Sequence, residues 1–366
     1  MDANEQKLKV LSMLQEGTIT QSEALELLEL IGAELNAQQV KQPKPTEPVE
    51  ADERRPRRER EPIKLSIPES PIDFMGGSHQ VFSATADVDA DVIRMLKLVG
   101  KNSKISLRTH QQGTIQIEGR YKPIRNGDPK IRFEEQNGSY ALNYNSHAVS
   151  YMGLDVSVPE NLIKRLHVEN SNAEISLTGV ASTELNVTTK NARLRLQGIQ
   201  SDVIVASTKN GNIDVNEVAA TKIELGTTNA EIDVRNVKAN YAELFTTNAS
   251  VMSDCNQIIT TKVRTKNANI WLDITNLAIQ LEDCQYVIDG QTTNGNIDVL
   301  LPYKEELPYK INANTKRGRI RTKGSELLVI ASDKGYLDGK TVDYKLSGTK
   351  LDLALQTTNA DINVNK

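Results

Sequence analysis

Three acidic residues, Asp214, Glu231 and Asp233, stand at equivalent places in neighbouring segments of the sequence, where they could act together. Pairs of carboxylates catalyse glycoside hydrolysis, one as the general acid and the other as the nucleophile or base. Arg193 and Arg195 occupy the same places one segment earlier, so the charge alternates along the chain. We therefore expect cross-strand ion pairs at these positions, with a carbohydrate-active enzyme as the alternative.

The other residue types that commonly carry out catalysis are scattered. The four histidines lie far apart in the sequence, at His79, His110, His147 and His167. Their spacing matches neither a zinc site nor a nucleophile with its base. The two cysteines, Cys255 and Cys284, form neither a metal spacing nor a disulfide framework, which is typical of a reducing compartment. The sequence therefore predicts no catalytic residue, no metal and no cofactor.

The composition narrows the class of protein. The 366 residues carry a net charge of −4, so nothing attracts the chain as a whole to nucleic acid, and no nucleic-acid partner is expected. Only 38% of the residues are hydrophobic and 4% aromatic, which suits a narrow stacked fold better than a compact globule. The N-terminus lacks the apolar stretch of a signal peptide, and no apolar run is long enough for a transmembrane helix. We expect a cytoplasmic location, with association to a membrane surface left open.

Residues 1–35 are predicted to form a small helical hairpin. Leucines recur at helical spacing on both sides of a break at Gly17. Thr20 and Glu23 match a capping box for the second helix, and Gly32 is placed to end that helix. Two short helices bury too little apolar surface to be stable alone. We therefore expect the hairpin to dock on a partner, on a second copy or on the body of the same chain.

Residues 36–62 are predicted to be a disordered linker, because prolines interrupt the segment and it has no apolar cluster. The linker contains an arginine cluster formed by Arg54, Arg55, Arg57, Arg58 and Arg60. Such a cluster could contact anionic lipid headgroups or nucleic acid. The interleaved glutamates and the lack of aromatic residues favour a solvated tether instead.

From residue 63 to the end, the alternation of apolar and polar residues predicts β-structure, which becomes regular from about residue 150. An Asn followed by Ala or Gly recurs every 19 residues from Asn172 to Asn267, and recurs at longer intervals at Asn294 and Asn359. A constant period near twenty residues is typical of a solenoid in which each repeat is one coil. We predict a mainly β fold, a parallel β-helix of about 19 residues per coil over residues 63–366.

Two later turns follow a similar pattern. Arg317 with Gly318, and Lys334 with Gly335, stand where Asn and Ala stand in the regular coils. Each pair is therefore expected to form a corner of a coil. Insertions at the turns account for the unequal spacing, because loops tolerate changes in length.

The repeated Asn is predicted to be a structural corner. Asn tolerates left-handed backbone, and the small residue after it allows close approach of the next coil. A Thr two positions before the Asn is expected to face inward with its apolar neighbours. Stacked coils bring equivalent side chains to about 4.8 Å from one another, so we expect ladders of identical residues. The predicted ladder consists of Asn172, Asn191, Asn210, Asn229, Asn248, Asn267, Asn294 and Asn359.

Three apolar residues are predicted to form a partner surface. Phe245, Met252 and Trp271 occupy outward positions where other coils carry polar residues. An apolar patch on the outside of a solenoid often marks an interface. The insertion between Asp273 and Cys284 could instead cover these residues.

The end of the chain is predicted to leave an open strand edge. The sequence stops two residues after Val364, with no helix to cap the last coil. Open edges template association, and proteins usually protect them. Either Asp361, Asn363 and Lys366 blunt this edge, or another chain covers it.

The repeats, together with VSVPENLIKRLHVENSNAEISL (156–177) and IDVLLPYKEELPYKINANTKRGRI (297–320), resemble the bacterial putative-adhesin domain family over roughly residues 75–366. The segment KLKVLSMLQEGTITQSEALELLELI resembles the short helical module that precedes this domain in YvlB-like and LiaX-like proteins. The resemblance implies a β-helical body and a link to the cell-envelope stress response, in some relatives at the cell surface. It implies no catalytic residue.

The sequence favours a non-enzymatic scaffold or interaction protein linked to cell-envelope stress. Its partners would be proteins or further copies of itself, bound through the solenoid faces and the N-terminal hairpin. Two alternatives stay open: a carbohydrate-binding or carbohydrate-active β-helix, and a scaffold that polymerises end to end through the open last coil.

Overall fold

A computed structural model describes residues 63–366 apart from 68–71, 74–77, 89–91, 125–126, 161–162, 276, 278–282, 303–306 and 325. The predicted helical hairpin, the linker and its arginine cluster fall in residues 1–62, outside the described residues. The described part consists of strands, with one short 3-10 helix, η1 (Val342–Lys345). The prediction of a mainly β repeat fold is confirmed.

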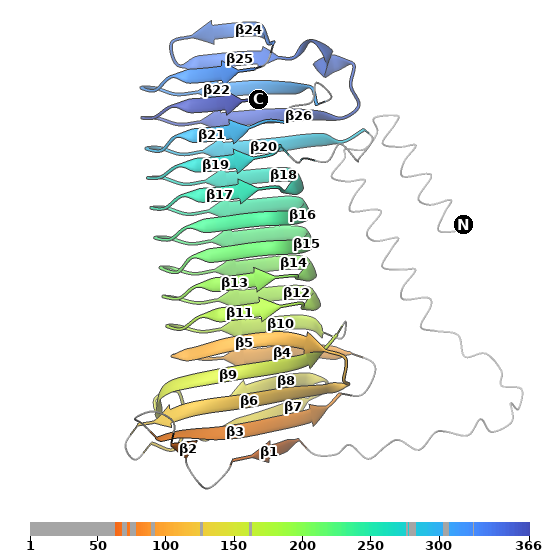
Figure 1. Ribbon diagram of the computed structural model, residues 1–366, viewed down its shortest axis with the longest axis vertical. Helices are drawn as coiled ribbons and strands as arrows, with labels where there is room; N and C mark the ends of the chain where they lie inside the picture. Colours follow the sequence, from red (N-terminus) through yellow and green to blue (C-terminus); the bar gives the residue numbers. More distant parts are fainter. Residues whose placement is uncertain are drawn as a thin grey trace, which may run out of the picture. The chain divides into compact units, whose positions relative to one another are not determined.

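Apart from an antiparallel hairpin near the C-terminus, the chain from residue 163 onward winds in coils that stack through parallel strands (Figure 1). In the first regular coil, β10 (Ile163–Glu169) runs to a corner and β11 (Ile175–Thr178) leaves it on the opposite side. β12 (Ala181–Thr188) then begins the next coil and pairs with β10 in parallel. The strands before the corners form one sheet, here called sheet 1, and the strands after the corners form sheet 2.

Sheet 1 contains, in stacking order after β12, β14 (Gln200–Ser207), residues 219–226 of β15 (Ile213–Gly226), residues 238–245 of β16 (Ile232–Phe245), β18 (Gln257–Arg264) and β20 (Gln285–Gln291). Sheet 2 contains, after β11, β13 (Leu194–Gln197), residues 213–216, residues 232–235, β17 (Val251–Asp254), β19 (Ile270–Asp273) and β21 (Ile297–Leu300).

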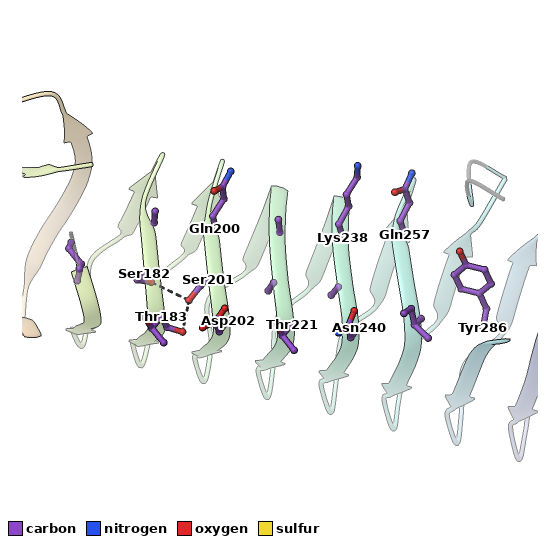
Figure 2. Close-up of a pocket in the computed structure, with 16 residues that line it drawn as sticks. Ser182, Thr183, Gln200, Ser201, Asp202, Thr221, Lys238, Asn240, Gln257 and Tyr286 are labelled. Atoms are coloured by element: carbon purple, nitrogen blue, oxygen red, sulfur yellow. Dashed lines mark hydrogen bonds between the residues drawn. The ribbon is translucent and has the colours of Figure 1, made fainter. Parts of the chain in front are cut away.

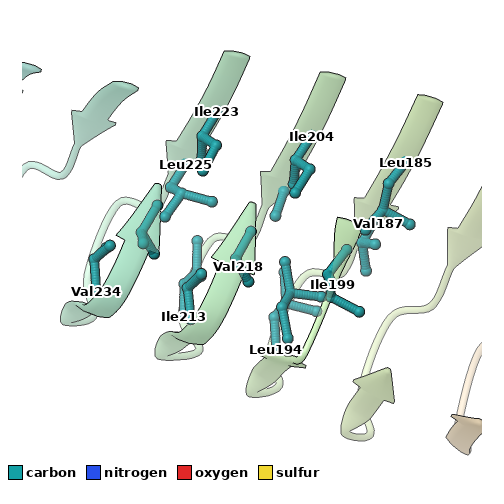
Figure 3. Close-up of a cluster of buried hydrophobic side chains, with 14 of the residues drawn as sticks. Leu185, Val187, Leu194, Ile199, Ile204, Ile213, Val218, Ile223, Leu225 and Val234 are labelled. Atoms are coloured by element: carbon teal, nitrogen blue, oxygen red, sulfur yellow. The ribbon is translucent and has the colours of Figure 1, made fainter. Parts of the chain in front are cut away.

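The core is a thin layer of aliphatic side chains between the two sheets (Figure 3). Leu185 and Ile204 from sheet 1 are buried in this layer, as are Leu194, Ile213 and Val234 from sheet 2. Every second residue of a strand points inward, so the apolar positions of each coil fall on the same side of its sheet. Each coil covers the core of its neighbours, and stability therefore depends on unbroken stacking.

Each coil also has a second corner, which the sequence did not reveal. One residue at this corner adopts left-handed backbone in five successive coils, with φ from 53° to 69°. These residues are Gly179, Gly198, Glu217, Asn236 and Cys255. Only Gly adopts this conformation without steric cost, and the five residues share no chemical type. Because the backbone angle repeats at this corner but the residue type does not, the sequence shows no repeated motif there.

From Asn191 onward, the residue two positions before each corner Asn is a buried Thr, and in most coils it donates to a carbonyl of the preceding coil. Thr246 Oγ1, for example, lies 3.1 Å from the carbonyl oxygen of Ala230. Thr189 is the exception, because its hydroxyl has no hydrogen-bond partner within the described structure. The equivalent carbonyl, that of Ala173, instead accepts a hydrogen bond from Asn170 Nδ2 at 2.5 Å.

We expect Thr246→Val to lower the free energy of unfolding by about 1–2 kcal/mol, because the Ala230 carbonyl would lose its donor inside the protein. The same change at Thr189 removes a hydroxyl that has no partner, so Thr189→Val should be neutral or stabilising. Urea unfolding of the two variants measures the difference. Equal losses in both would show that the threonine hydroxyls contribute only through packing.

Residues 63–159 form an irregular end of the solenoid. The antiparallel strands here are β3 (Ser78–Asp87), β6 (Thr114–Pro123) and β9 (Val149–Pro159), with β1 (Lys64–Ser66) and β2 (Ile72–Asp73) beside β3. The strands that join this end to β10 and β11 in parallel are β4 (Ile93–Val99) and β5 (Ser103–His110), and β4 also pairs with the hairpin of β7 (Arg132–Gln136) and β8 (Ser139–Asn143).

At the other end, the last coil in the sequence is not the last coil in space. β26 (Lys350–Gln356) lies between β20 and β22 (Tyr309–Asn314), and pairs with both in parallel. β27 (Ile362–Asn365) likewise lies between β21 and β23 (Ile320–Lys323). The prediction that Asp361, Asn363 and Lys366 border an open edge is therefore wrong, because both edges of the C-terminal strand are paired.

The expected coil corner at Lys334 and Gly335 is also wrong. These residues form the turn of an antiparallel hairpin between β24 (Leu328–Asp333) and β25 (Tyr336–Lys340), and β25 pairs with β22. A Cβ atom on Gly335 would lie 2.0 Å from the carbonyl oxygen of Thr315, so glycine is needed for this close approach. Among the described strands, β24 and β23 are consequently the last strands of sheet 1 and sheet 2.

Candidate ligand-binding groove

A groove of about 780 Å³ runs along sheet 1 and crosses successive coils between Ile163 and Tyr286 (Figure 2). Each central coil contributes three consecutive residues near the start of its sheet 1 strand. Because neighbouring strands lie about 4.8 Å apart, the groove extends about 29 Å along the axis. Its shape suits an extended ligand that lies across the coils.

The groove exists because one register position carries small side chains in four successive coils. These residues are Ser182, Ser201, Ala220 and Ala239. The same position is occupied by Ile163 in the coil before them and by Ile258 in the coil after them. Small side chains leave the outer surface hollow, and the bulkier isoleucines mark the two ends of the hollow. The recurrence of small residues every 19 positions was a signal that the sequence contained and that sequence reasoning missed.

The four small residues form the floor of the groove, and a row of polar side chains, here called a rim, borders it on each side. Figure 2 shows Gln200, Lys238 and Gln257 along one rim. The opposite rim is lined by Thr183, Asp202, Thr221 and Asn240. Amide and hydroxyl groups both donate and accept hydrogen bonds, so the rims can bind a ligand that has alternating donors and acceptors.

The floor and the rims differ in how many of their polar side chains form hydrogen bonds within the protein. Ser201 Oγ lies 3.1 Å from Ser182 Oγ and 3.1 Å from the carbonyl oxygen of Val203, so its hydroxyl is engaged within the protein. By contrast, the side chains of Thr221 and Asn240 form no hydrogen bond with other described residues, which leaves the rim groups available to a ligand.

Two of the three acidic residues considered for catalysis, Asp214 and Asp233, lie on sheet 2 and are bound to arginines. Arg193 Nη2 donates to Asp214 Oδ1 at 2.8 Å, across two neighbouring coils. Arg235 Nη2 donates to Asp233 Oδ2 at 2.7 Å. The hydrogen bonds to these carboxylates raise the pKa of both arginines. Glu231 lies just before the start of β16, and its backbone N–H donates to Asn212 Oδ1. The two aspartates are held as ion-pair partners, an arrangement typical of a structural surface.

The corner asparagines are linked by side-chain hydrogen bonds from coil to coil. Each donates its Nδ2 to the Oδ1 of the preceding one at 2.6–2.8 Å, from Asn191 to Asn359. Asn172 in turn donates to Asn102 at 2.7 Å. Sequence reasoning missed Asn102 because Ser follows it and 70 residues separate it from Asn172. These side chains satisfy one another, so the row is a structural ladder and not a binding site.

The three apolar residues expected to form one partner surface lie on two different sheets. Phe245 ends the sheet 1 part of β16, whereas Met252 and Trp271 are register partners on sheet 2. The corner at Asn248 turns the chain from one sheet to the other between Phe245 and Met252. The predicted single surface is therefore corrected to two separate exposed aromatic positions, Phe245 on one sheet and Trp271 on the other.

No group of three or more His, Cys, Asp or Glu side chains in the described part of the chain is arranged to hold a metal ion. None of the described residues belongs to a helix long and apolar enough to span a bilayer.

Solved structures with a similar fold come from bacterial proteins of low sequence identity. A putative adhesin from Parabacteroides merdae is 12% identical, with a TM-score of 0.45, covering 78% of this chain and 96% of its own. A putative adhesin from Bacteroides fragilis is 8% identical, with a TM-score of 0.39 and the same coverage of 78% and 96%. A putative lipid binding protein from Parabacteroides distasonis is 10% identical, with a TM-score of 0.43, covering 81% of this chain and 99% of its own. These values carry no argument about function.

No curated protein matches the chain. The family described as Toastrack DUF4097 matches residues 96–366, which is more than half of the sequence. This match confirms the family resemblance that the repeats suggested. The chain belongs to the Toastrack DUF4097 family.

Proposed function

We propose that the protein is a non-catalytic interaction scaffold of the cell-envelope stress response, and that the groove on sheet 1 binds an extended segment of a partner protein. The observation that carries this proposal is the row of rim side chains, repeated from coil to coil, whose hydrogen-bonding groups are unused within the described structure. Amide side chains such as Asn240 can bind both the N–H and the C=O groups of a peptide backbone. An extended peptide rises about 3.3 Å per residue, so about eight or nine residues would fill the groove.

The link to envelope stress rests on the resemblance of the N-terminal segment and the repeats to proteins of that response. We place the protein in the cytoplasm, because Cys255 and Cys284 are partly buried thiols that are not joined in a disulfide, as is usual in a reducing compartment. Fractionation of cells with and without a membrane-active antibiotic tests the location. Recovery of the protein outside the cell would refute it.

The groove is tested by selecting random ten-residue peptides, displayed on phage, on the full-length chain. Thr221→Trp puts a bulky ring on the rim, and we expect the selected peptides to bind this variant at least about tenfold more weakly, a difference of about 1.4 kcal/mol. Thr178→Trp is the matched control, because Thr178 is an exposed strand residue on sheet 2. Peptides that bind both variants equally well would refute the groove as their site.

A carbohydrate ligand is the rival, and a panel of linear oligosaccharides is tested in parallel. Binding of oligosaccharides alone, lost in Thr221→Trp, would replace the peptide proposal with the carbohydrate one. Loss of a glycan-cleaving activity on Asp214→Ala would contradict the non-catalytic part of the proposal.

A further inference from the structure

The end of the solenoid that closes with β23 and β24 carries an exposed aliphatic strand. β24 pairs only with β25 among the described strands, and all six of its residues are exposed. Leu328, Val329 and Ile330 expose 50%, 56% and 59% of their surface. Just beyond the hairpin, Val342 and Leu346 expose 61% and 87%. Proteins usually protect an edge strand with charge or cover it, so this apolar edge is suited to contact with another surface.

The last corner and strand of sheet 2, at the same end of the stack, are strongly basic. Residues 315–323 contain five basic side chains and no acidic one: Lys316, Arg317, Arg319, Arg321 and Lys323. Arg321 is bound to Asp361 at 2.6 Å, and the same carboxylate accepts a hydrogen bond from the backbone N–H of Arg319. These bonds lower the pKa of Asp361. Lys316, Arg317 and Lys323 are exposed and have no carboxylate partner within the described structure.

This end of the molecule differs in charge from the chain as a whole. Residues 315–350 contain nine Lys or Arg and four Asp or Glu, a balance of +5, whereas the full chain carries −4. The basic and the aliphatic residues share one end because β22 and β23 belong to the same coil and β25 and β24 extend the sheet from β22. Figure 1 shows β24 at the extreme end of the stack. We call this the terminal surface, formed by Lys316, Arg317, Lys323, Leu328, Val329, Ile330, Val342 and Leu346.

We propose that the terminal surface binds the surface of an anionic lipid bilayer. Exposed aliphatic side chains beside unpaired cations are the combination that binds an interface of acidic headgroups over acyl chains. A second copy meeting the first through the same end would bring two surfaces of like charge together, which opposes association. An anionic bilayer can interact with both the basic and the aliphatic residues of the terminal surface, because its headgroups neutralise the cations and the acyl chains beneath them contact the aliphatic side chains.

The test is flotation of the full-length protein with vesicles of phosphatidylcholine, with or without phosphatidylglycerol. We expect binding only when phosphatidylglycerol is present, and weaker binding when the salt is raised from about 0.1 M to about 0.5 M. The triple variant Lys316→Ala, Arg317→Ala and Lys323→Ala should lose about 100-fold in affinity. The double variant Val329→Ser and Ile330→Ser should lose about tenfold.

Matched controls separate the terminal surface from general charge and apolar exposure. Lys190→Ala, Lys209→Ala and Lys266→Ala remove three exposed lysines from corners of the central coils, and Phe245→Ser removes an exposed aromatic residue from sheet 1. Both controls should bind vesicles like the unaltered protein. Equal losses in the controls would overturn the proposal.

Two further outcomes would also overturn the proposal. Binding that survives both terminal variants but disappears when Arg54, Arg55, Arg57, Arg58 and Arg60 become Gln would assign the membrane contact to the linker. Absence of vesicle binding, together with a dimer in sedimentation that Val329→Ser and Ile330→Ser dissociate, would assign the terminal surface to self-association.

Discussion

Deletion of residues 350–366 is expected to unfold the C-terminal end of the stack rather than to shorten it by one coil. β26 and β27 are internal strands, each hydrogen-bonded to a strand on both sides. Five aliphatic side chains of this segment are fully buried: Leu351, Leu353, Leu355, Ile362 and Val364. Their removal would cost on the order of 10 kcal/mol, which is comparable to the whole net stability of a typical domain.

Hydrogen exchange of the truncated chain measures how far the loss spreads. We expect the amides of β20 to β23 to lose protection while those of β12 to β15 keep it, because each coil contacts only its neighbours. If β22 and β23 stayed protected, they would pair directly with β20 and β21 in the shortened chain. That result would mean that the C-terminal coil can be replaced within the stack.

A pair of point variants tests the same order of coils without a deletion. Leu353 is buried between register partners Ile288 and Ile311, so Leu353→Ala should cost about 3–4 kcal/mol. Ile320 lies on β23, the last strand of sheet 2, and is only partly buried. Ile320→Ala should therefore cost less, about 1 kcal/mol. The opposite ranking in urea unfolding would place the C-terminal coil at the end of the stack.

The sequence could predict the solenoid because its strongest signal has one physical cause. Every regular coil meets the same core and the same corner, so Thr, Asn and the inward aliphatic residues recur with a fixed period. The parallel register of 19 residues follows from that period, as for Leu194 and Ile213. Burial of Thr246 and its neighbours follows from the period-two alternation of a strand.

The order of the last coils could not be predicted from the same pattern. The segment around Asn359 repeats the corner around Asn294 almost residue for residue, so it can stack on either side of a similar coil. Nothing in a periodic pattern says which neighbour comes next in space. Lys334 and Gly335 are equally ambiguous, because a small residue after a polar one suits a hairpin turn as well as a solenoid corner.

The candidate groove was predictable in part. Ser182, Ser201, Ala220 and Ala239 recur at the coil period in one strand position, where a row of small residues leaves a hollow on the outer surface of the sheet. The unused rim groups could not be predicted, because hydrogen bonding depends on coordinates. Phe245 shows a related limit: outward character can be read from alternation, but the sheet on which a residue lies depends on which side of the corner it falls.

Gly211→Ala is expected to be destabilising, although it adds one methyl group and Ala stands at the equivalent position of other coils, as at Ala192 and Ala230. Gly211 follows the corner Asn210, and a Cβ atom there would lie 1.8 Å from the carbonyl oxygen of Ala192 in the preceding coil. Real Cβ atoms do not approach a backbone oxygen so closely, so the backbone of this corner would have to shift from its present conformation. The backbone N–H of Gly211 is also fixed, because it donates to Thr208 Oγ1 at 3.2 Å. We expect a loss of about 3 kcal/mol in the free energy of unfolding, at the upper end for an overpacked site.

The matched control is the same substitution at Gly226, in the sheet 1 part of β15. A Cβ atom on Gly226 would have no other atom within 4 Å, so Gly226→Ala introduces no clash. Because alanine restricts the unfolded chain more than glycine does, this variant should be neutral or more stable by up to about 1 kcal/mol. Thermal and urea unfolding of both variants measure the contrast. A small effect at Gly211 would mean that neighbouring corners can move apart without disturbing the asparagine ladder, and that the close stacking of corners contributes little to the stability of the solenoid.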